Sequence, residues 1–271
     1  MIIDSHAHLN FKSFEGDLKE VLERCRNEQV RVINVGTKLE TSKKAVEIAE
    51  NNEGMYASVG LHPVHMITET IKIRMDEEEG GFSPKGEEFD GEEYKRICKS
   101  EKVVAIGEIG LDFYYKPKTK IRIEKYKSEQ SDLLLKQMKL AKELNLPVIF
   151  HCRKAHDLLI AILKKDPVLG VIHCFTGTWQ EAERYLEMGL YLGINGIMYK
   201  QDIKETIEKF PLERLLLETD SPYLIPKGIE AERNEPCYIK QIAKDVARIR
   251  GISFEEVIEA TSQNAQNLFG I

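Results

Sequence analysis

Two histidines one residue apart, His6 and His8, end a short apolar run at the start of the chain. Side chains at positions i and i+2 leave the same face of a β-strand, so both imidazoles could bind one metal ion if this run is a strand. Asp4 lies on that face as well and could orient an imidazole through a hydrogen bond. A single His-x-His pair is often accidental, so a metal site requires matching residues elsewhere in the chain.

Matching residues follow four other apolar runs. A histidine or a carboxylate in such a place is costly to bury unless it is paired or bound to metal. The runs end in Glu108, His151, His173 and the sequence Glu218-Thr219-Asp220. With the first pair they supply four histidines and two carboxylates, which suit Zn, Mn, Fe or Mg. Six groups exceed what one catalytic zinc takes from a protein, so they predict two divalent cations per subunit, bridged by the two oxygens of Glu108.

An alternation of strands and helices is predicted to bring these residues together. Runs rich in branched apolar residues predict eight strands, at residues 1–6, 31–36, 55–61, 103–109, 147–152, 170–175, 190–195 and 214–219. Amphipathic segments at helical spacing separate them, which predicts a parallel sheet. Eight units in 271 residues favour a closed (β/α)8 TIM barrel over an open doubly wound sheet, and no G-x-G-x-x-G motif follows the first strand. Barrel enzymes keep their sites at the carboxyl ends of the strands, so the candidate ligands should meet at that rim.

The chain, residues 1–271, is predicted to form a single domain with one insertion. Residues 66–91 are acidic, rich in glycine and poor in apolar residues, and we interpret them as a solvated insertion after the third strand rather than a lid. Two later helices are predicted to begin with capping boxes at Thr178 and Ser253. The last of them, 253–269, is predicted to complete the outer ring of helices.

Composition and charge limit the partners. The net charge is −6, so a nucleic acid must be met by a local basic patch or by metal ions rather than by the overall field. No apolar run is long enough to cross a bilayer and no leader is recognised, so no membrane partner is expected. Five scattered cysteines without a Cys-x-x-Cys motif indicate reduced thiols and a cytoplasmic location. Cys152 and Cys174 stand beside candidate histidines and should face the helices as buried apolar residues.

Six motifs stand out along the chain. They are His6-x-His8, Gly107-Glu108-Ile109-Gly110-Leu111-Asp112, His151-Cys152-Arg153, His173-Cys174-Phe175-Thr176-Gly177, Glu218-Thr219-Asp220-Ser221-Pro222 and Arg233-Asn234-Glu235-Pro236. Together they resemble the TatD family, metal-dependent deoxyribonucleases on a barrel of the amidohydrolase type, and the resemblance continues to the Leu268-Phe269-Gly270 ending. The sequence departs from the family at Lys154, where an acidic residue is common, at Phe113, where tyrosine is usual, and in its longer insertion. These departures bear on substrate preference.

The resemblance implies an activity and a ligand set. The activity is hydrolysis of DNA phosphodiester bonds as a 3′–5′ exonuclease on single strands or frayed ends, with no obligate protein partner. The implied metal positions are His6, His8, Glu108, His151, His173 and Asp220. We expect His6, His8 and Asp220 to bind one cation, His151 and His173 the other, and Glu108 both. Asp220 would also take the proton of the attacking water, which makes it and Glu108 the predicted catalytic residues.

Arg153 and His62 are the predicted substrate-binding residues. Arg153 follows a candidate histidine by two positions and could clamp a phosphate, or pair with a carboxylate at the rim. His62 could contact a phosphate or help protonate the leaving group, or bond to the turn that follows it. Glu218 is expected to be the hydrogen-bond partner of a ligand histidine. Trp179 could stack on a base, although packing against the barrel is the favoured interpretation.

Two other functions fit the same residues. A bimetal centre also attacks carbonyl carbon, so an amidohydrolase-like enzyme that cuts a small ester, an amide or an aminoacyl-tRNA ester is the first alternative. The second is a metal-bearing barrel without activity that serves as a binding partner in a larger assembly, which predicts a closed site with every metal position filled by protein.

Overall fold

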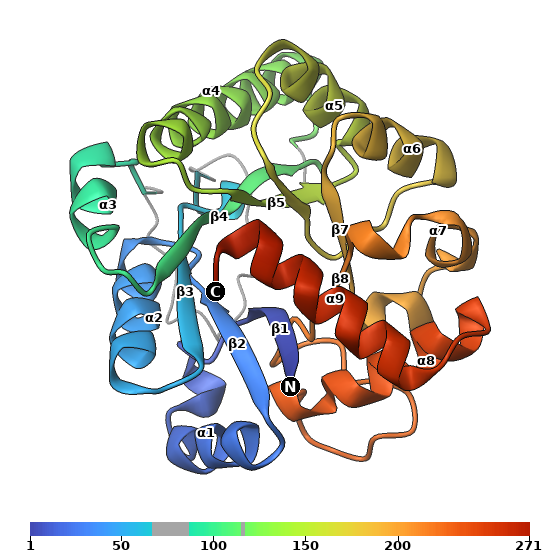
Figure 1. Cartoon of the computed structure of the whole chain (residues 1–271). Coiled ribbons are helices and arrows are strands. Elements are labelled where there is room, and N and C mark those ends of the chain that lie inside the picture. Colours follow the sequence, from blue (N-terminus) through green and yellow to red (C-terminus); the bar gives the residue numbers. More distant parts are fainter. Residues whose placement is uncertain (67–86, 115–116) are drawn as a thin grey trace.

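Eight parallel strands form one sheet in the order of the sequence, and the sheet curls into a nearly closed barrel (Figure 1). The computed structural model describes residues 1–66, 87–114 and 117–271. The strands are β1 Ile2–Ala7, β2 Val30–Val35, β3 Met55–Val59, β4 Val103–Asp112, β5 Val148–Arg153, β6 Gly170–Ile172, β7 Tyr191–Ile194 and β8 Leu215–Leu217. The first and last strands meet through a parallel bridge between Ala7 and Ser221. The prediction of a (β/α)8 TIM barrel is confirmed.

Helices cover the outside of the barrel (Figure 1). In the described residues they are α1 Leu18–Asn27, α2 Leu39–Asn51, α3 Gly91–Ile97, α4 Lys120–Leu144, α5 His156–Lys165, α6 Trp179–Glu187, α7 Lys204–Lys209, α8 Ile239–Arg250 and α9 Phe254–Phe269. Short 3-10 helices join them at η1 Lys12–Phe14, η2 Pro63–Met66, η4 Gly196–Tyr199, η5 Leu212–Arg214 and η6 Pro236–Tyr238. Both predicted capping boxes are present, because the side chains of Thr178 and Ser253 accept the N–H groups at the third positions of α6 and α9.

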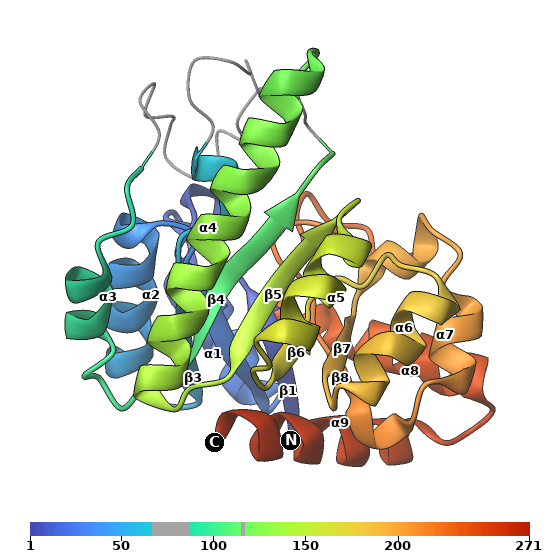
Figure 2. The same ribbon diagram turned by 90° about the horizontal axis from the view of Figure 1, so that it is seen from above.

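The last helix does not join the outer ring as predicted. It lies across the end of the barrel at which the strands begin, where both chain termini also lie (Figures 1 and 2). Its Ala265, Leu268 and Phe269 belong to a buried cluster with side chains from the strand starts, among them Ile3 and Ile149. Since this removes apolar surface of both the helix and the strands from water, α9 closes this end, which we call the floor. The opposite end is the mouth.

Several strands end at other residues than predicted. β6 stops at Ile172 and β8 at Leu217, whereas the predicted strands ran to residues 175 and 219. His173 and Asp220 therefore lie in the loops just beyond their strands. β4 instead continues to Asp112.

The backbone is left-handed at four non-glycine residues that line the pocket at the mouth. The φ angle is +60° at Lys154, +45° at Cys174 and +57° at both Asp220 and Leu224. Side chains other than glycine rarely adopt this left-handed region, and such strain concentrates at functional sites. The mouth therefore has a backbone that tertiary contacts hold in place.

The predicted insertion at 66–91 lies largely outside the described residues, because 67–86 are not described. The described chain resumes before α3, which Asp90 caps by accepting the N–H groups of Glu92 and Glu93. Among the described residues, no helix combines the length and apolar character needed to cross a membrane.

Candidate metal centre

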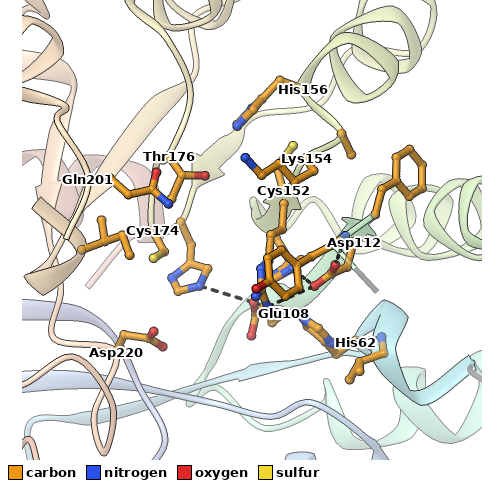
Figure 3. A pocket seen from close by; sticks show the side chains of 18 of the residues that line it. His62, Glu108, Asp112, Cys152, Lys154, His156, Cys174, Thr176, Gln201 and Asp220 are labelled. Carbon is orange, nitrogen blue, oxygen red and sulfur yellow. Dashed lines mark hydrogen bonds and ion pairs between the residues drawn. The ribbon is translucent and has the colours of Figure 1, made fainter. Parts of the chain in front are cut away.

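Glu108 occupies the middle of the mouth, and imidazole nitrogens surround its carboxylate (Figure 3). The Glu108 oxygens lie 2.7 Å from His151 Nδ1, 3.4 Å from His173 Nε2, 3.5 Å from His62 Nε2, 3.6 Å from His6 Nε2 and 4.0 Å from His8 Nε2. The carboxylate is 4% exposed. A buried carboxylate among several imidazoles is the donor set that Zn, Mn or Fe prefers in proteins.

Asp220 closes the centre on the side opposite His62, with Glu108 between them (Figure 3). One Asp220 oxygen is 3.8 Å from His6 Nε2 and 3.6 Å from His8 Nε2. These two ring nitrogens are themselves 3.1 Å apart. All six implied metal positions therefore converge, although they come from five strands or the loops after them.

The ligand atoms form groups that differ in part from the expected division between two cations. Three groups have ligand atoms within 4.8 Å of one another: His6 with His173 and Asp220, His6 with His8 and Glu108, and His62 with Glu108 and His151. His173 stacks on the ring of His6 at a centroid distance of 3.6 Å, yet its Nε2 lies 3.4 Å from the same Glu108 oxygen that is 2.7 Å from Nδ1 of His151. Glu108 belongs to two of the groups, which is the position expected of a bridge.

Hydrogen bonds behind the centre set the tautomers of two rings. Nδ1 of His8 is 2.9 Å from the carbonyl oxygen of Val35, and Nδ1 of His173 is 3.0 Å from the carboxylate of Glu218. Both partners accept, so the Nδ1 atoms carry the hydrogens. In the neutral rings the Nε2 lone pairs then face the centre, as a metal ligand requires. The residues present therefore fit a divalent cation.

His62 has the opposite arrangement. Its Nδ1 accepts the backbone N–H of Val64 at 3.1 Å. In the neutral ring the hydrogen is therefore on Nε2, the atom that faces Glu108. His62 thus offers the centre a hydrogen-bond donor rather than a lone pair. Its contact with the following turn, one of the predicted alternatives, is present.

Glu218 is confirmed as the hydrogen-bond partner of a candidate histidine. The same oxygen that bonds to His173 also accepts the N–H of Cys174 at 2.7 Å and the amide of Asn195 at 2.9 Å. The other oxygen packs over Gly193, where a Cβ would stand 2.3 Å away. Sequence reasoning missed Asn195 and Gly193, because β7 carries no candidate ligand at its end.

Asp112 is a second residue that sequence reasoning left without a role. Its carboxylate is 3.1 Å from Nε2 of His151 and 3.8 Å from the guanidinium of Arg153. Its backbone is fixed from α4, since Gln130 accepts its N–H at 2.8 Å and the Tyr126 hydroxyl donates to its carbonyl at 3.0 Å. The sequence signal that could have pointed to Asp112 is its position at the end of the Gly107–Asp112 motif.

Without a cation, two rings of the centre, His151 and His173, hold a second proton at neutral pH, whereas burial and the neighbouring His173 lower the pKa of His6. Burial acts to lower the pKa of His151, but hydrogen bonds to Asp112 and Glu108 outweigh it and raise that pKa to about 9. Burial also opposes the charge of His173, but the carboxylates of Glu218 and Glu108 raise its pKa to about 10. Burial would raise the pKa of Glu108, yet the imidazoles around it hold that pKa well below its usual value. Protons and a cation therefore compete for the same rings.

The prediction that Asp4 orients an imidazole is wrong. Asp4 instead accepts the backbone N–H of His6 at 3.2 Å, and the N–H and hydroxyl of Thr219 at 2.9 and 2.5 Å. It therefore joins β1 to the loop after β8, where the sheet closes. Burial raises its pKa to about 8. Nδ1 of His6, the atom it could have contacted, has no hydrogen-bond partner among the described residues.

The two cysteines beside candidate histidines both line the pocket but differ in their contacts. Cys152 is 4% exposed, as predicted, and its Sγ accepts the hydroxyl of Tyr185 from α6 at 3.8 Å. Cys174 lines the pocket above the centre, with its Sγ 3.6 Å from Oδ1 of Asn195, because β6 has already ended and strand alternation no longer applies. Trp179 is half-buried and packs against the core, with the ammonium of Lys209 5.5 Å from its ring centre, in agreement with the favoured interpretation.

Cations line the pocket that opens above the centre. They are Lys127, Arg153, Lys154 and Lys200. The guanidinium of Arg153 also stacks on the ring of Tyr114 at 3.7 Å, and this tyrosine is 52% exposed. Arg153 thus combines a rim ion pair, one of its predicted alternatives, with a position in the pocket. These four side chains, which we call the basic patch, share the lining with the carboxylates Asp157 and Glu181 and give a chain of net charge −6 local cations for a polyanion.

Comparison with known proteins now identifies the family. A model described as TatD related DNase matches residues 3–270. The chain belongs to the TatD family. This TatD-family protein is similar to the uncharacterized metal-dependent hydrolase YabD of Bacillus subtilis, with 37% identity covering 100% of both chains. It is also similar to the 3′–5′ ssDNA/RNA exonuclease TatD of Cronobacter sakazakii, with 35% identity covering 99% of this chain and 97% of that one.

The solved structures agree with this assignment. The crystal structure of YjjV, a TatD homologue from Escherichia coli, superposes with a TM-score of 0.82 at 31% identity, covering 100% of this chain and 98% of that one. The TatD-family protein is therefore a metal-dependent hydrolase, and the alternative of a barrel without activity is set aside.

Proposed function

We propose that this protein hydrolyses phosphodiester bonds of DNA as a 3′–5′ exonuclease, acting on single strands or frayed ends with two divalent cations. The observation that carries the proposal is the pairing of the histidine–carboxylate centre with four cations around its pocket, in an otherwise acidic chain. A phosphodiester needs both a hydrolytic centre and positive charge beside it. The names of the exonuclease relatives support the same substrate.

The six implied metal positions would hold the cations. They are His6, His8, Glu108, His151, His173 and Asp220. When bound, such cations lower the pKa of water and neutralise phosphate charge. We assign Glu108 to both cations because one of its oxygens is the nearer to His6 and His8 and the other is the nearer to His151 and His173.

The remaining chemistry falls to side chains at the mouth. Asp220 takes a proton from the attacking water as the water oxygen forms its bond to phosphorus. Arg153 orients the phosphate, held in place by Asp112 and by the ring of Tyr114. His62 presents an N–H at Nε2 that hydrogen-bonds to O3′ as the P–O3′ bond breaks, and so helps its protonation, with the proton itself coming from water. Residues 1–271 would act as one catalytic domain, and the family match over 3–270 supports this.

The test is metal-dependent removal of mononucleotides from the 3′ end of single-stranded DNA, which is seen as stepwise shortening of a strand labelled at its 5′ end. Glu108→Gln and Asp220→Asn should each lower the rate by about 10³-fold or more, because the centre acts as a unit. Unchanged cleavage in both variants would refute the mechanism. A side-by-side assay on small esters and an aminoacyl-tRNA tests the alternative substrate, and faster turnover of an ester than of DNA would overturn the nuclease proposal. A cytoplasmic location remains a prediction, consistent with five free cysteines.

A further inference from the structure

Helix α4 extends beyond the ends of the strands on the mouth side of the barrel (Figure 2). It is attached at the rim, where Tyr126 and Gln130 bond to the backbone of Asp112. The residues that precede Tyr126 continue the helix above the rim. We call residues 120–125 the α4 overhang. At 1.5 Å per residue, the axis from Lys127 to Lys120 covers roughly 10 Å.

The face of α4 that packs on the barrel changes character along the helix. Below the rim it is buried and formed by Leu133, Leu134, Gln137, Met138 and Ala141. Successive residues are about 100° apart, so the same face continues upward through Ile123, with Arg122 and Lys120 at its two edges. Ile123 is half-buried and both cations are exposed. Where the barrel wall ends, this face therefore presents positive charge to the space above the mouth.

These two cations extend the basic patch of the pocket. Lys120 lies seven residues before Lys127, hence on nearly the same side of the helix, and Lys127 lines the pocket. Within the described part of the chain neither Lys120 nor Arg122 forms an ion pair, whereas Lys125 and Lys127 pair with glutamates at 3.6 and 3.5 Å. Positive charge thus continues from the rim of the pocket along the helix and away from the metal centre.

We propose that the α4 overhang binds the sugar–phosphate backbone of the nucleic-acid strand whose end lies at the metal centre. The inference rests on the proposed function and adds a binding surface for the nucleotides that are not being cleaved. The reach of roughly 10 Å from Lys127 to Lys120 spans more than one phosphate, since one strand of a duplex carries a phosphate for every ~3.4 Å of helix axis. Longer strands therefore bind more tightly than a single nucleotide.

The test compares two charge reversals on the same helix. The double variant Lys120→Glu/Arg122→Glu removes the cations that face the mouth. The matched control Lys136→Glu/Lys139→Glu makes the same change of charge on exposed residues of the opposite face, outside the overhang. All four side chains are exposed, and equal thermal midpoints check that both variants fold.

The readouts are KM for a 20-nucleotide single strand, its salt dependence, and kcat/KM for the small diester thymidine 5′-p-nitrophenyl phosphate. In the first variant we expect KM for the strand to rise about tenfold and the log–log salt slope to fall by about 1.4, because two phosphate contacts contribute about 0.7 each. The small diester should be cleaved as by the unmodified protein. The control should change none of these three readouts by more than about twofold.

Equal effects of the two variants would overturn the inference, since the overall field would then explain them, and so would an unchanged KM in the first variant. Binding of the labelled strand is measured in parallel by fluorescence anisotropy in the Asp220→Asn background. If the unmodified protein cleaves no DNA, the proposed function fails, while the anisotropy comparison still decides whether the overhang binds the strand.

Discussion

The two ends of the barrel are built from the same eight strands but have opposite character. At the floor, a buried apolar cluster joins the strand starts to α9. It contains Ile3, Ile149 and Leu216 from the strands and Leu268 and Phe269 from the helix. At the mouth, the same strands deliver imidazoles and carboxylates to one buried point. Apolar burial at the floor stabilises the fold, whereas the burial of clustered polar groups at the mouth destabilises it.

Along each strand, residues at the floor end contribute to stability and residues at the mouth end contribute to the chemistry. Left-handed backbone at Lys154, Cys174, Asp220 and Leu224 lines the pocket at the mouth, whereas the left-handed non-glycine residues at the floor end, Gln29 and Asn145, lie in the turns before β2 and β5. The helix that seals the floor contains no such residue inside it, since its only left-handed position is the terminal Gly270. Changes at the floor should therefore act on folding, and changes at the mouth on catalysis.

The largest expected contrast is between Phe269→Ala at the floor and Asp220→Asn at the mouth. Phe269 is 6% exposed, so its truncation should lower the free energy of unfolding by about 3–5 kcal/mol. Its kcat per folded molecule should stay unchanged. Asp220→Asn should leave the thermal midpoint of the metal-free protein within a few degrees, because asparagine tolerates left-handed φ. Denaturant unfolding measures the free energy of unfolding, and active-site titration gives the concentration of folded enzyme from which kcat is calculated. A Phe269→Ala variant with full stability would contradict the expected difference between the two ends.

An intermediate effect is expected behind the mouth, at Glu218. Glu218→Gln removes the charge that holds Nδ1 of His173, so metal affinity should fall 10–100-fold while stability changes little. Competition with a chelating dye measures the affinity. The exposed Glu213, near the floor, offers the control Glu213→Gln, which should bind metal as the unmodified protein does. Similar losses in both variants would indicate a general effect of net charge.

The smallest expected effect is proton release when metal binds. The pKa values of about 9 for His151 and about 10 for His173 mean that both rings hold a second proton at pH 7 in the metal-free protein. These raised pKa values stabilise the metal-free fold fully below the unfolded value of about 6.5, and this contribution is lost as pH rises through 9 and 10. Metal must displace the protons, so its affinity should fall as pH falls.

Calorimetric metal titration in buffers of different ionisation enthalpy measures this release. The Phe269→Ala variant, changed only at the floor, should release the same number of protons. Release of no protons at pH 7 would contradict the assignment of His151 and His173 to the centre.

Much of the site was predictable because strand ends are visible in sequence. An apolar run followed by a polar residue marks a strand and its approximate end, which is how Glu108, His151 and His173 were found, although β4 continues past Glu108 and β6 ends before His173. Asp112 and Asn195 escaped because neither is an expected ligand, and their contacts involve partners far away in sequence. The position of α9 escaped for a similar reason, since an apolar stripe does not say which surface it covers.

The sequence by itself determined the barrel, the order of its strands and the residue types at their ends, because hydrophobic periodicity and strand–helix alternation are local properties. Only the tertiary structure decided which ring lies beside which carboxylate, which nitrogen faces the centre, and how far α4 rises above the rim. These depend on hydrogen bonds such as those of His62 to Val64 and of His173 to Glu218, and on where each strand stops. Side-chain orientation at a site is set by contacts between distant segments, and no local pattern encodes them.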